Sequence, residues 1–245
     1  MIQTFYVKQK LCERAQAWFC ENNLLLNSDK TQKLLISSCD RSEDINSVCV
    51  LGITIDNKLN WSVHIDCLSK KLATSIFALR RLSNSLSIDA LRISYFALFH
   101  SKMIYEITLW GGSTNALKIF RLQKKAIRVI MHMGPKESCR NTFSFLGIMT
   151  LPAAFIFNTL LEIHQNKSLY PTVGDSGVNT RTSNNLKLPR YRLAKSLKNS
   201  RNLNLYNRLP TTLRALDIER FKISIKEILT KKSFYTVNEF LDYNF

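Results

Sequence analysis

Apolar residues recur at helical spacing near the start of the chain. Four of them predict a helix at about residues 8–22: Leu11, Ala15, Trp18 and Phe19. The pattern ends at Glu21-Asn22-Asn23, where three polar residues replace the apolar face. Two short apolar runs follow, "KLLIS" at 33–37 and "VCVLGITID" at 48–56, and each predicts a strand. Two such strands make at most a hairpin, which is marginally stable without helices to cover it.

After Trp61 the pattern is helical almost throughout. The longer helices are expected at about 62–84, 87–109, 114–132 and 152–166. Shorter helices are expected at about 209–216, 218–232 and 236–243. The most apolar segment, "FLGIMTLPAAFIFNTLLEI" at 145–163, contains Pro152 and several polar residues, so it predicts a buried helix beginning at Pro152 and no membrane partner.

These patterns predict a mainly α protein with a short β-hairpin near the N-terminus. Residues 170–200 are polar and contain two prolines and two glycines, which favours a basic connector. The expected organisation has four parts: residues 1–60 with the first helix and hairpin, 61–168 as a helical domain, 169–202 as a linker, and 203–245 as a C-terminal helical segment. The three tryptophans, Trp18, Trp61 and Trp110, are expected to anchor the core.

Charge adds a class of partner to this outline. The formal net charge is +17, and residues 1–60 contribute none of it because their seven basic and seven acidic side chains cancel. A positive excess of this size, all after residue 60, favours a polyanion, and nucleic acid before a membrane surface. We therefore expect RNA or DNA as the partner, bound through the phosphate backbone.

One helix pattern concentrates this charge on a single face. In "LKIFRLQKKAIRVI", residues 117–130, four cations are spaced three and four residues apart: Lys118, Arg121, Lys125 and Arg128. Apolar residues occupy the opposite face, so one face can pack while the other contacts phosphates. The alternative is an ordinary solvated helix face.

Residues typical of catalysis or metal binding form no recognisable motif. The six cysteines include no C-x-x-C pair and the four histidines are isolated, which argues against a zinc site or a disulfide framework. Reduced thiols indicate a cytoplasmic or nuclear location. The only adjacent acidic pair, Glu43-Asp44, lies in a polar loop, whereas two-metal phosphoryl transfer needs several converging carboxylates.

Eight segments, in order, carry a family resemblance: "WFCENNLLLNSDKTQKLLI", "VLGITIDNKLNWSVHI", "LWGGS", "IFRLQKKAIRVI", "SCRNTFSFLGIMTLP", "NTR", "YNRLP" and "FYTVNEFL". Together they resemble the C-terminal part of reverse transcriptases, RNA-directed DNA polymerases, from jockey-like non-LTR retrotransposons. The resemblance implies the end of a palm, then a helical, thumb-like bundle and a connection from Trp61 onward.

The resemblance also implies roles for particular residues. Asn27, Lys30 and Thr31 match an N-x-x-K-T motif whose lysine lies near the phosphates of the incoming nucleotide. Leu51 and Gly52 match the hairpin that grips the primer strand. Glu106 stands where the family usually has glycine.

The family's catalytic aspartates lie upstream of the matched region, so the resemblance implies a truncated polymerase remnant. We expect no catalytic residue and no cofactor, because the family's Mg²⁺ is held by those absent aspartates. Two alternatives remain: an active subunit that receives its palm in trans, and a non-catalytic helical protein-interaction module derived from a retroelement. The sequence leaves the choice between RNA and DNA, and the oligomeric state, open.

Overall fold

A computed structural model describes residues 13–27, 30–32, 34, 36, 47–177, 182–189 and 197–245. The chain divides into two compact units, Met1–Leu59 and Asn60–Phe245. The division expected from the sequence also has a boundary at residue 60. Its further boundaries, on either side of 169–202, remain a prediction.

The first unit contains one helix and one hairpin. The helix is described over residues 13–21, and the strands are β1 (Ser47–Val50) and β2 (Ile53–Asp56). The strands pair antiparallel, with Val50 opposite Ile53. The expectation of one strand over 48–56 was therefore wrong, because the chain reverses in the middle of that run. The described residues of the other expected strand, Leu34 and Ile36, are not in a strand, and the rest of 33–37 lies outside the described residues.

The reversal takes place at Leu51-Gly52, where both residues have positive φ angles, 50° and 82°. Positive φ at both central residues is the requirement of a type I′ hairpin turn, which suits the twist of the two strands. A Cβ atom on Gly52 would meet nothing within 4 Å, so the backbone conformation alone calls for glycine there.

Large apolar side chains of the first unit are mostly exposed. Trp18 is 55% exposed and Leu25 is 101% exposed, whereas Val48 and Ile53 in the hairpin are buried. The prediction that Trp18 anchors the core was wrong. Its helical spacing with Leu11 and Ala15 indicated a helix, but spacing alone does not supply a neighbour to pack against.

The second unit is helical in every described regular element. Its first helices are α2 (Ser62–Leu82), α3 (Ile88–Tyr95), the π-helical turn η2 (Phe96–His100), α4 (Ser101–Ile104), α5 (Ile107–Trp110) and α6 (Ala116–Ile130). The single helix expected at 87–109 is interrupted after α4, where Glu106 has a φ of 49°. This left-handed conformation is one that glycine adopts most easily.

The remaining elements complete a mainly α fold with a two-stranded antiparallel hairpin, as the sequence predicted. They are α7 (Arg140–Phe145), α8 (Leu151–Gln165), the 3₁₀ turns η3 (Lys167–Leu169) and η4 (Gly174–Ser176), α9 (Leu197–Asn207), α10 (Thr211–Arg214), α11 (Ile218–Lys232) and α12 (Val237–Leu241). Thr150 caps α8 by accepting a hydrogen bond from the Ala153 N–H, and Pro152 lies in its first turn. The short helix α7 was not expected, and neither was α9, which begins inside the segment 169–202 that was expected to be a linker.

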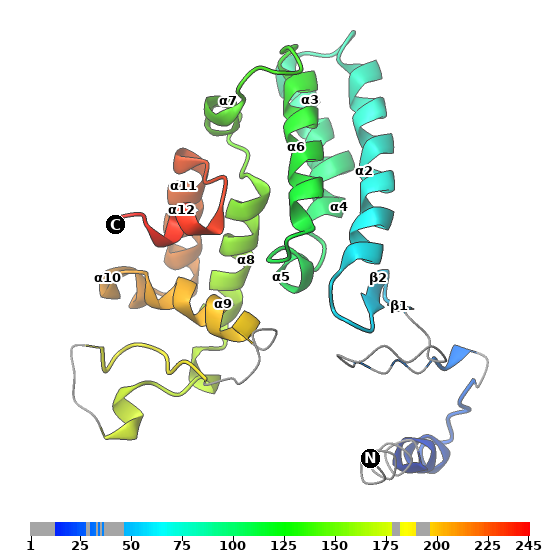
Figure 1. The fold of residues 1–245 in the computed structure, drawn as a ribbon, viewed down its shortest axis with the longest axis vertical. Coiled ribbons are helices and arrows are strands. Elements are labelled where there is room, and N and C mark those ends of the chain that lie inside the picture. The colour runs from blue at the N-terminus through cyan, green and yellow to red at the C-terminus, as the bar shows by residue number, and fades with distance from the viewer. Residues whose placement is uncertain are drawn as a thin grey trace. The chain divides into compact units, whose positions relative to one another are not determined.

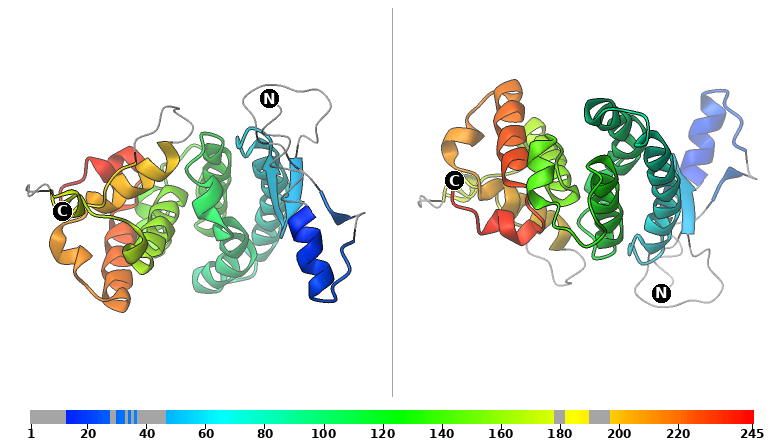
Figure 2. Two further views of the ribbon diagram at one scale, coloured as in Figure 1. Left: turned by 90° about the horizontal axis from the view of Figure 1, so that it is seen from below. Right: turned by 90° about the horizontal axis from the view of Figure 1, so that it is seen from above.

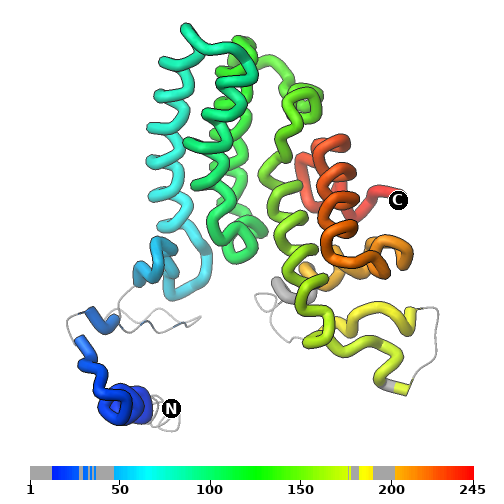
Figure 3. Tube along the Cα trace, turned by 180° about the vertical axis from the view of Figure 1, so that it is seen from behind, coloured from blue at the N-terminus to red at the C-terminus, as the bar shows by residue number. Residues whose placement is uncertain are grey.

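Helix packing places α6 between α2 and α8 (Figures 1 and 2). On the other side of α8 lies α11, and α9 and α12 also contact α8 (Figure 3). The core includes large side chains that are fully buried, among them Trp110, Tyr95, Phe99, Phe143 and Phe221. Trp61 is buried too, so two of the three expected tryptophan anchors are confirmed.

Gln123 is a buried polar residue of α6 whose side-chain NH₂ and carbonyl groups both form hydrogen bonds. Its Nε2 donates to the Tyr95 hydroxyl at 3.0 Å and to the Met149 carbonyl at 2.9 Å, and its Oε1 accepts from the Leu151 N–H at 2.7 Å. Because a buried amide is costly unless it is hydrogen-bonded, these contacts fix the register of α3, α6 and the start of α8.

His164 of α8 joins the C-terminal helices in a similar way. Its ring stacks on Phe221 with centroids 3.9 Å apart. Its Nε2 lies 3.0 Å from the Leu216 carbonyl, which can only accept, so Nε2 carries the proton and Nδ1 accepts from the Tyr206 hydroxyl at 2.9 Å. Burial lowers the pKa of His164, consistent with this neutral form.

The described part of the expected linker is attached to this unit. Leu186 is buried, and its N–H and carbonyl both bond the side-chain amide of Asn207 in α9, each at 2.9 Å. Thr172 and Leu186 form an isolated antiparallel bridge. Among the described residues, no helix is long and apolar enough to cross a membrane.

Candidate nucleic-acid interface

Helix α6 carries the predicted basic stripe, and its end has a defined geometry. The Met133 N–H bonds the Arg128 carbonyl at 2.9 Å, and the His132 N–H bonds the Val129 carbonyl at 3.4 Å. These two bonds form a Schellman motif, which ends a helix with a left-handed residue, usually glycine. Here that residue is His132, with a φ of 51°. The motif exposes the imidazole beside the last turn of α6.

Lys118, the first residue of the stripe, is paired rather than free. Its Nζ lies 2.5 Å from the Asp66 carboxylate of α2, and both side chains are more than half exposed. The basic stripe contains no acidic residue, and the neighbouring helix α2 supplies one. An exposed pair of this kind adds little stability, but it cancels the charge of Lys118 at the N-terminal end of α6.

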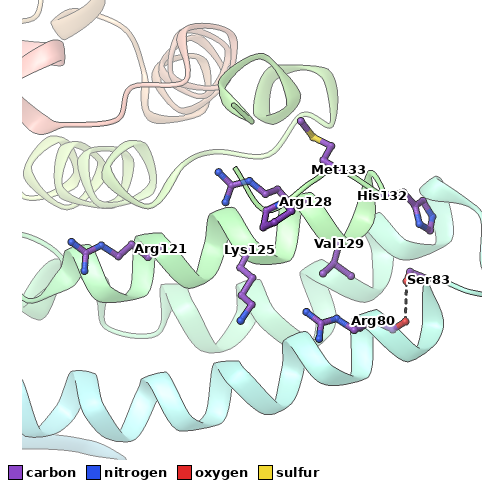
Figure 4. A pocket seen from close by; sticks show the side chains of 9 residues that line it. Arg80, Ser83, Arg121, Lys125, Arg128, Val129, His132 and Met133 are labelled. Carbon is purple, nitrogen blue, oxygen red and sulfur yellow. Dashed lines mark hydrogen bonds between the residues drawn. The ribbon is translucent and has the colours of Figure 1, made fainter. Parts of the chain in front are cut away.

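The other three predicted residues line one depression of about 640 Å³ between the C-terminal parts of α2 and α6. Arg80 of α2 joins them there (Figure 4). Nine described residues form its walls, and none of them is acidic: Arg80, Ser83, Arg121, Lys125, Arg128, Val129, His132, Met133 and Pro135. In Figure 4, Lys125 extends from α6 toward α2. The sequence stripe is thus half of a two-helix basic depression.

Arg128 is held in place without losing its charge. Its Nε donates to the backbone carbonyl of Glu137 at 2.9 Å. The Glu137 carboxylate forms no ion pair with Arg128. Its Oε1 accepts a hydrogen bond from the Gly134 N–H at 2.8 Å. A Cβ on residue 134 would lie 2.7 Å from that carboxylate oxygen, so glycine permits the contact. The guanidinium is thereby oriented while its charge stays available to a ligand.

Helix dipoles explain some of the positive charge, but not all of it. Cations in the last turn of a helix stabilise the partial negative charge of its C-terminus. Arg80 and Arg128 lie in the last turns of α2 and α6 and meet this description. Arg121 and Lys125 lie further back, are exposed, and have no ion-pair partner among the described residues. Their charge is therefore in excess of what the fold itself uses.

The residues of the N-x-x-K-T motif lie together in the first unit. The Asn27 Oδ1 accepts from the Lys30 N–H at 3.1 Å, and the Thr31 hydroxyl donates to the Asn27 carbonyl at 2.7 Å. These contacts order a local turn and leave the Lys30 side chain exposed. Leu51 and Gly52, the other two family-motif positions, form the hairpin turn described above. The roles that the resemblance implies for these five residues stay predictions.

Sequence reasoning missed Arg80 and His132. The helix at 62–84 was expected, and Arg80-Arg81 near its end was a visible basic pair, but no local pattern says that α2 packs beside α6. His132 is the last residue of the helix expected at 114–132, and a histidine at a helix end is too common to single out a site.

No group of three or more His, Cys, Asp or Glu side chains that could hold a metal ion occurs in the described part of the chain. The described cysteines, Cys20, Cys49, Cys67 and Cys139, are free thiols. Comparisons with protein-family models, curated proteins and solved structures find no match to this chain.

Proposed function

We propose that this protein binds nucleic acid through the phosphate backbone, at the basic depression between α2 and α6. The observation that carries the proposal is that four cations from two helices, Arg80, Arg121, Lys125 and Arg128, line one depression, with no acidic residue among the described walls. Phosphate contacts from arginine and lysine supply most of the sequence-independent affinity for nucleic acid. None of the nine walls is Phe, Tyr or Trp, so we expect little base stacking and little sequence preference.

The family resemblance supports the same kind of ligand. A thumb-like bundle beside the palm of a retrotransposon reverse transcriptase contacts template and primer. The proposal is therefore that the second unit is the nucleic-acid-holding part of an RNA-directed DNA polymerase, without catalytic residues of its own. The resemblance supports the polymerase origin, and the charged depression supports the binding.

The test compares two triple variants by fluorescence anisotropy on a short duplex at several salt concentrations. Arg80→Gln, Arg121→Gln and Lys125→Gln together remove three charges from the depression. Lys167→Gln, Lys222→Gln and Lys231→Gln remove three exposed charges that do not line it. We expect the slope of log K against log salt to become shallower by roughly 2 to 3 in the first variant only. Equal slopes for both variants, with circular dichroism unchanged, would reduce the depression to a solvated surface.

The Lys118–Asp66 pair allows a second test, in which a substitution should strengthen binding. Asp66→Asn removes the partner carboxylate and returns the charge of Lys118 to the stripe. The salt slope should then steepen by about 1. Asp66→Asn combined with Lys118→Gln is the matched control and should return the slope to that of the unmodified protein. A single variant that binds no more strongly than this double variant would show that the nucleic acid does not reach the N-terminal end of α6.

A further inference from the structure

The depression concentrates more charge than one internal phosphate of a strand can use. A phosphodiester carries a single negative charge, whereas four cations and His132 line this one volume of about 640 Å³. A terminal phosphate monoester carries about −1.5 to −2 at neutral pH and offers three acceptor oxygens. Resting on the proposed function, we infer that the depression takes the terminal phosphate of a nucleic-acid strand in preference to an internal phosphodiester.

The donors suit a group with several oxygens in one place. Arginine presents a planar fork that binds two oxygens of a phosphate at once, and lysine adds a compact charge. Arg128 is already oriented by its bond to the Glu137 carbonyl, so less ordering is needed when a ligand binds. Arg80 approaches from α2, on the opposite wall from the α6 residues. A phosphate between the two helices would therefore be contacted from two sides.

Apolar side chains form another part of the wall. Val129, Met133 and Pro135 lie at the end where α6 stops and the chain turns. They offer no hydrogen bond to a continuing sugar-phosphate backbone. A strand that ends in the depression can place its terminal phosphate against the cations without running its backbone along the apolar wall. A strand that passes through would have to contact both walls.

His132 adds an imidazole to the wall of the depression. It occupies the left-handed position of the Schellman motif, where glycine is the usual residue because a Cβ is strained there. Its imidazole lines the depression, where it can donate to a phosphate oxygen (Figure 4).

The spacing of the cations along α6 suits a nucleic-acid strand better than a phosphorylated peptide. From Arg128 to Arg121 the helix rises about 10 Å, at 1.5 Å per residue. Successive phosphates of one DNA strand advance about 3.4 Å along the duplex axis, so about three phosphates span this distance. Arg121 and Lys125 can therefore contact the phosphates that follow the terminal one. A phosphopeptide has no such repeat of charge behind its phosphate.

The experiment measures binding of one short oligonucleotide to the full chain in three forms: with a 5′-phosphate, with a 3′-phosphate and with hydroxyl ends only. We expect at least one phosphorylated form to bind about tenfold more tightly than the hydroxyl form at pH 7.5. The preference should shrink below pH 6, where the phosphate dianion takes up one proton and becomes a monoanion. Arg80→Gln and His132→Gly should each reduce it several-fold. Because glycine suits the helix end, His132→Gly should keep the fold, which its melting temperature would show.

Each other result has a defined meaning. Equal affinity for all three forms, with binding still salt-dependent, would overturn the inference and leave the proposed function standing. Failure of every oligonucleotide to bind would overturn both. A preference that survives in Arg80→Gln and in His132→Gly, with both variants folded, would place the terminal phosphate elsewhere. A phosphoserine peptide that binds as tightly as the phosphorylated oligonucleotide would overturn the choice of nucleic acid as the occupant.

Discussion

The two units use the same kinds of residue with opposite results. In the first unit, Trp18 and Leu25 are exposed, whereas in the second, Trp110 and Tyr95 are fully buried. Both tryptophans lie in helical segments. The difference is that α5 lies against α8, while no described residue covers Trp18 to a similar degree. Most of a helix's stability in a protein comes from packing its apolar face. We therefore expect the stability of this chain to reside in residues 60–245.

The largest expected effect comes from truncating the two tryptophans in parallel. Trp110→Ala removes a fully buried ring whose Nε1 donates to the Tyr105 carbonyl, and it should cost about 3 to 5 kcal/mol. Trp18→Ala should cost less than about 0.5 kcal/mol, as for an exposed side chain. Urea unfolding followed by circular dichroism gives both values. Similar costs would mean that the first unit shares a core with the rest.

The next effect is a loss of stability in acid that belongs to the second unit, since all four histidines follow residue 60. Burial, and then the nearby Lys226, lowers the pKa of His100 to about 4. The unfolded chain therefore binds more protons between about pH 6.5 and pH 4, so stability should fall as pH falls through this window.

Over the full window His100 should account for about 3 kcal/mol. Burial also lowers the pKa of His64 and of His164, which adds to the loss in the same direction. His100→Gln should flatten the dependence of the unfolding free energy on pH relative to the unmodified protein. A parallel shift of both curves, with no change of slope, would contradict the assignment to His100.

The smallest effect compares two left-handed residues, one in each unit. Glu106 and Leu51 have φ angles of 49° and 50°. Glycine relieves the Cβ strain at such a position but loses more backbone freedom on folding, so the net gain is about 0.5 to 1 kcal/mol. Glu106→Gly should raise the midpoint of the main unfolding transition. Leu51→Gly should leave that transition unchanged if the hairpin unfolds separately, and Glu106→Ala, which keeps the Cβ, should give no gain.

Local patterns in the sequence predicted much of the fold. Helical spacing placed α2, α6, α8 and α11 close to their observed positions, because each buries one continuous face. Two of the errors arose where a single turn changes the direction of the chain. Glu106 ends the expected helix at 87–109, and Leu51-Gly52 folds the expected strand at 48–56 into a hairpin. Asn-Gly or Asp-Gly at these positions would have predicted a hairpin turn, whereas Leu-Gly is not a typical hairpin signal.

The candidate site was predictable only in part, for a different reason. The stripe on α6 is a local pattern, so three of its four residues were found where they line the depression. The pairing of Lys118 with Asp66 and the approach of Arg80 both depend on how α2 packs against α6. Lys118 and Asp66 are 52 positions apart in the sequence. Spacing along one helix carries no information about a contact of that kind.

The π-helical turn at Phe96–His100 has a consequence for how this segment can change in length during evolution. The buried residues Leu91, Tyr95, Phe99 and Met103 follow one another at intervals of four. In a regular α-helix each such step turns the face by about 40°, so the last of them would leave the core. The wider turn, formed by one extra residue, corrects this drift. Loss of a single residue from 96–100 would rotate everything after it by about 100°, so a one-residue deletion here should be selected against more strongly than most substitutions.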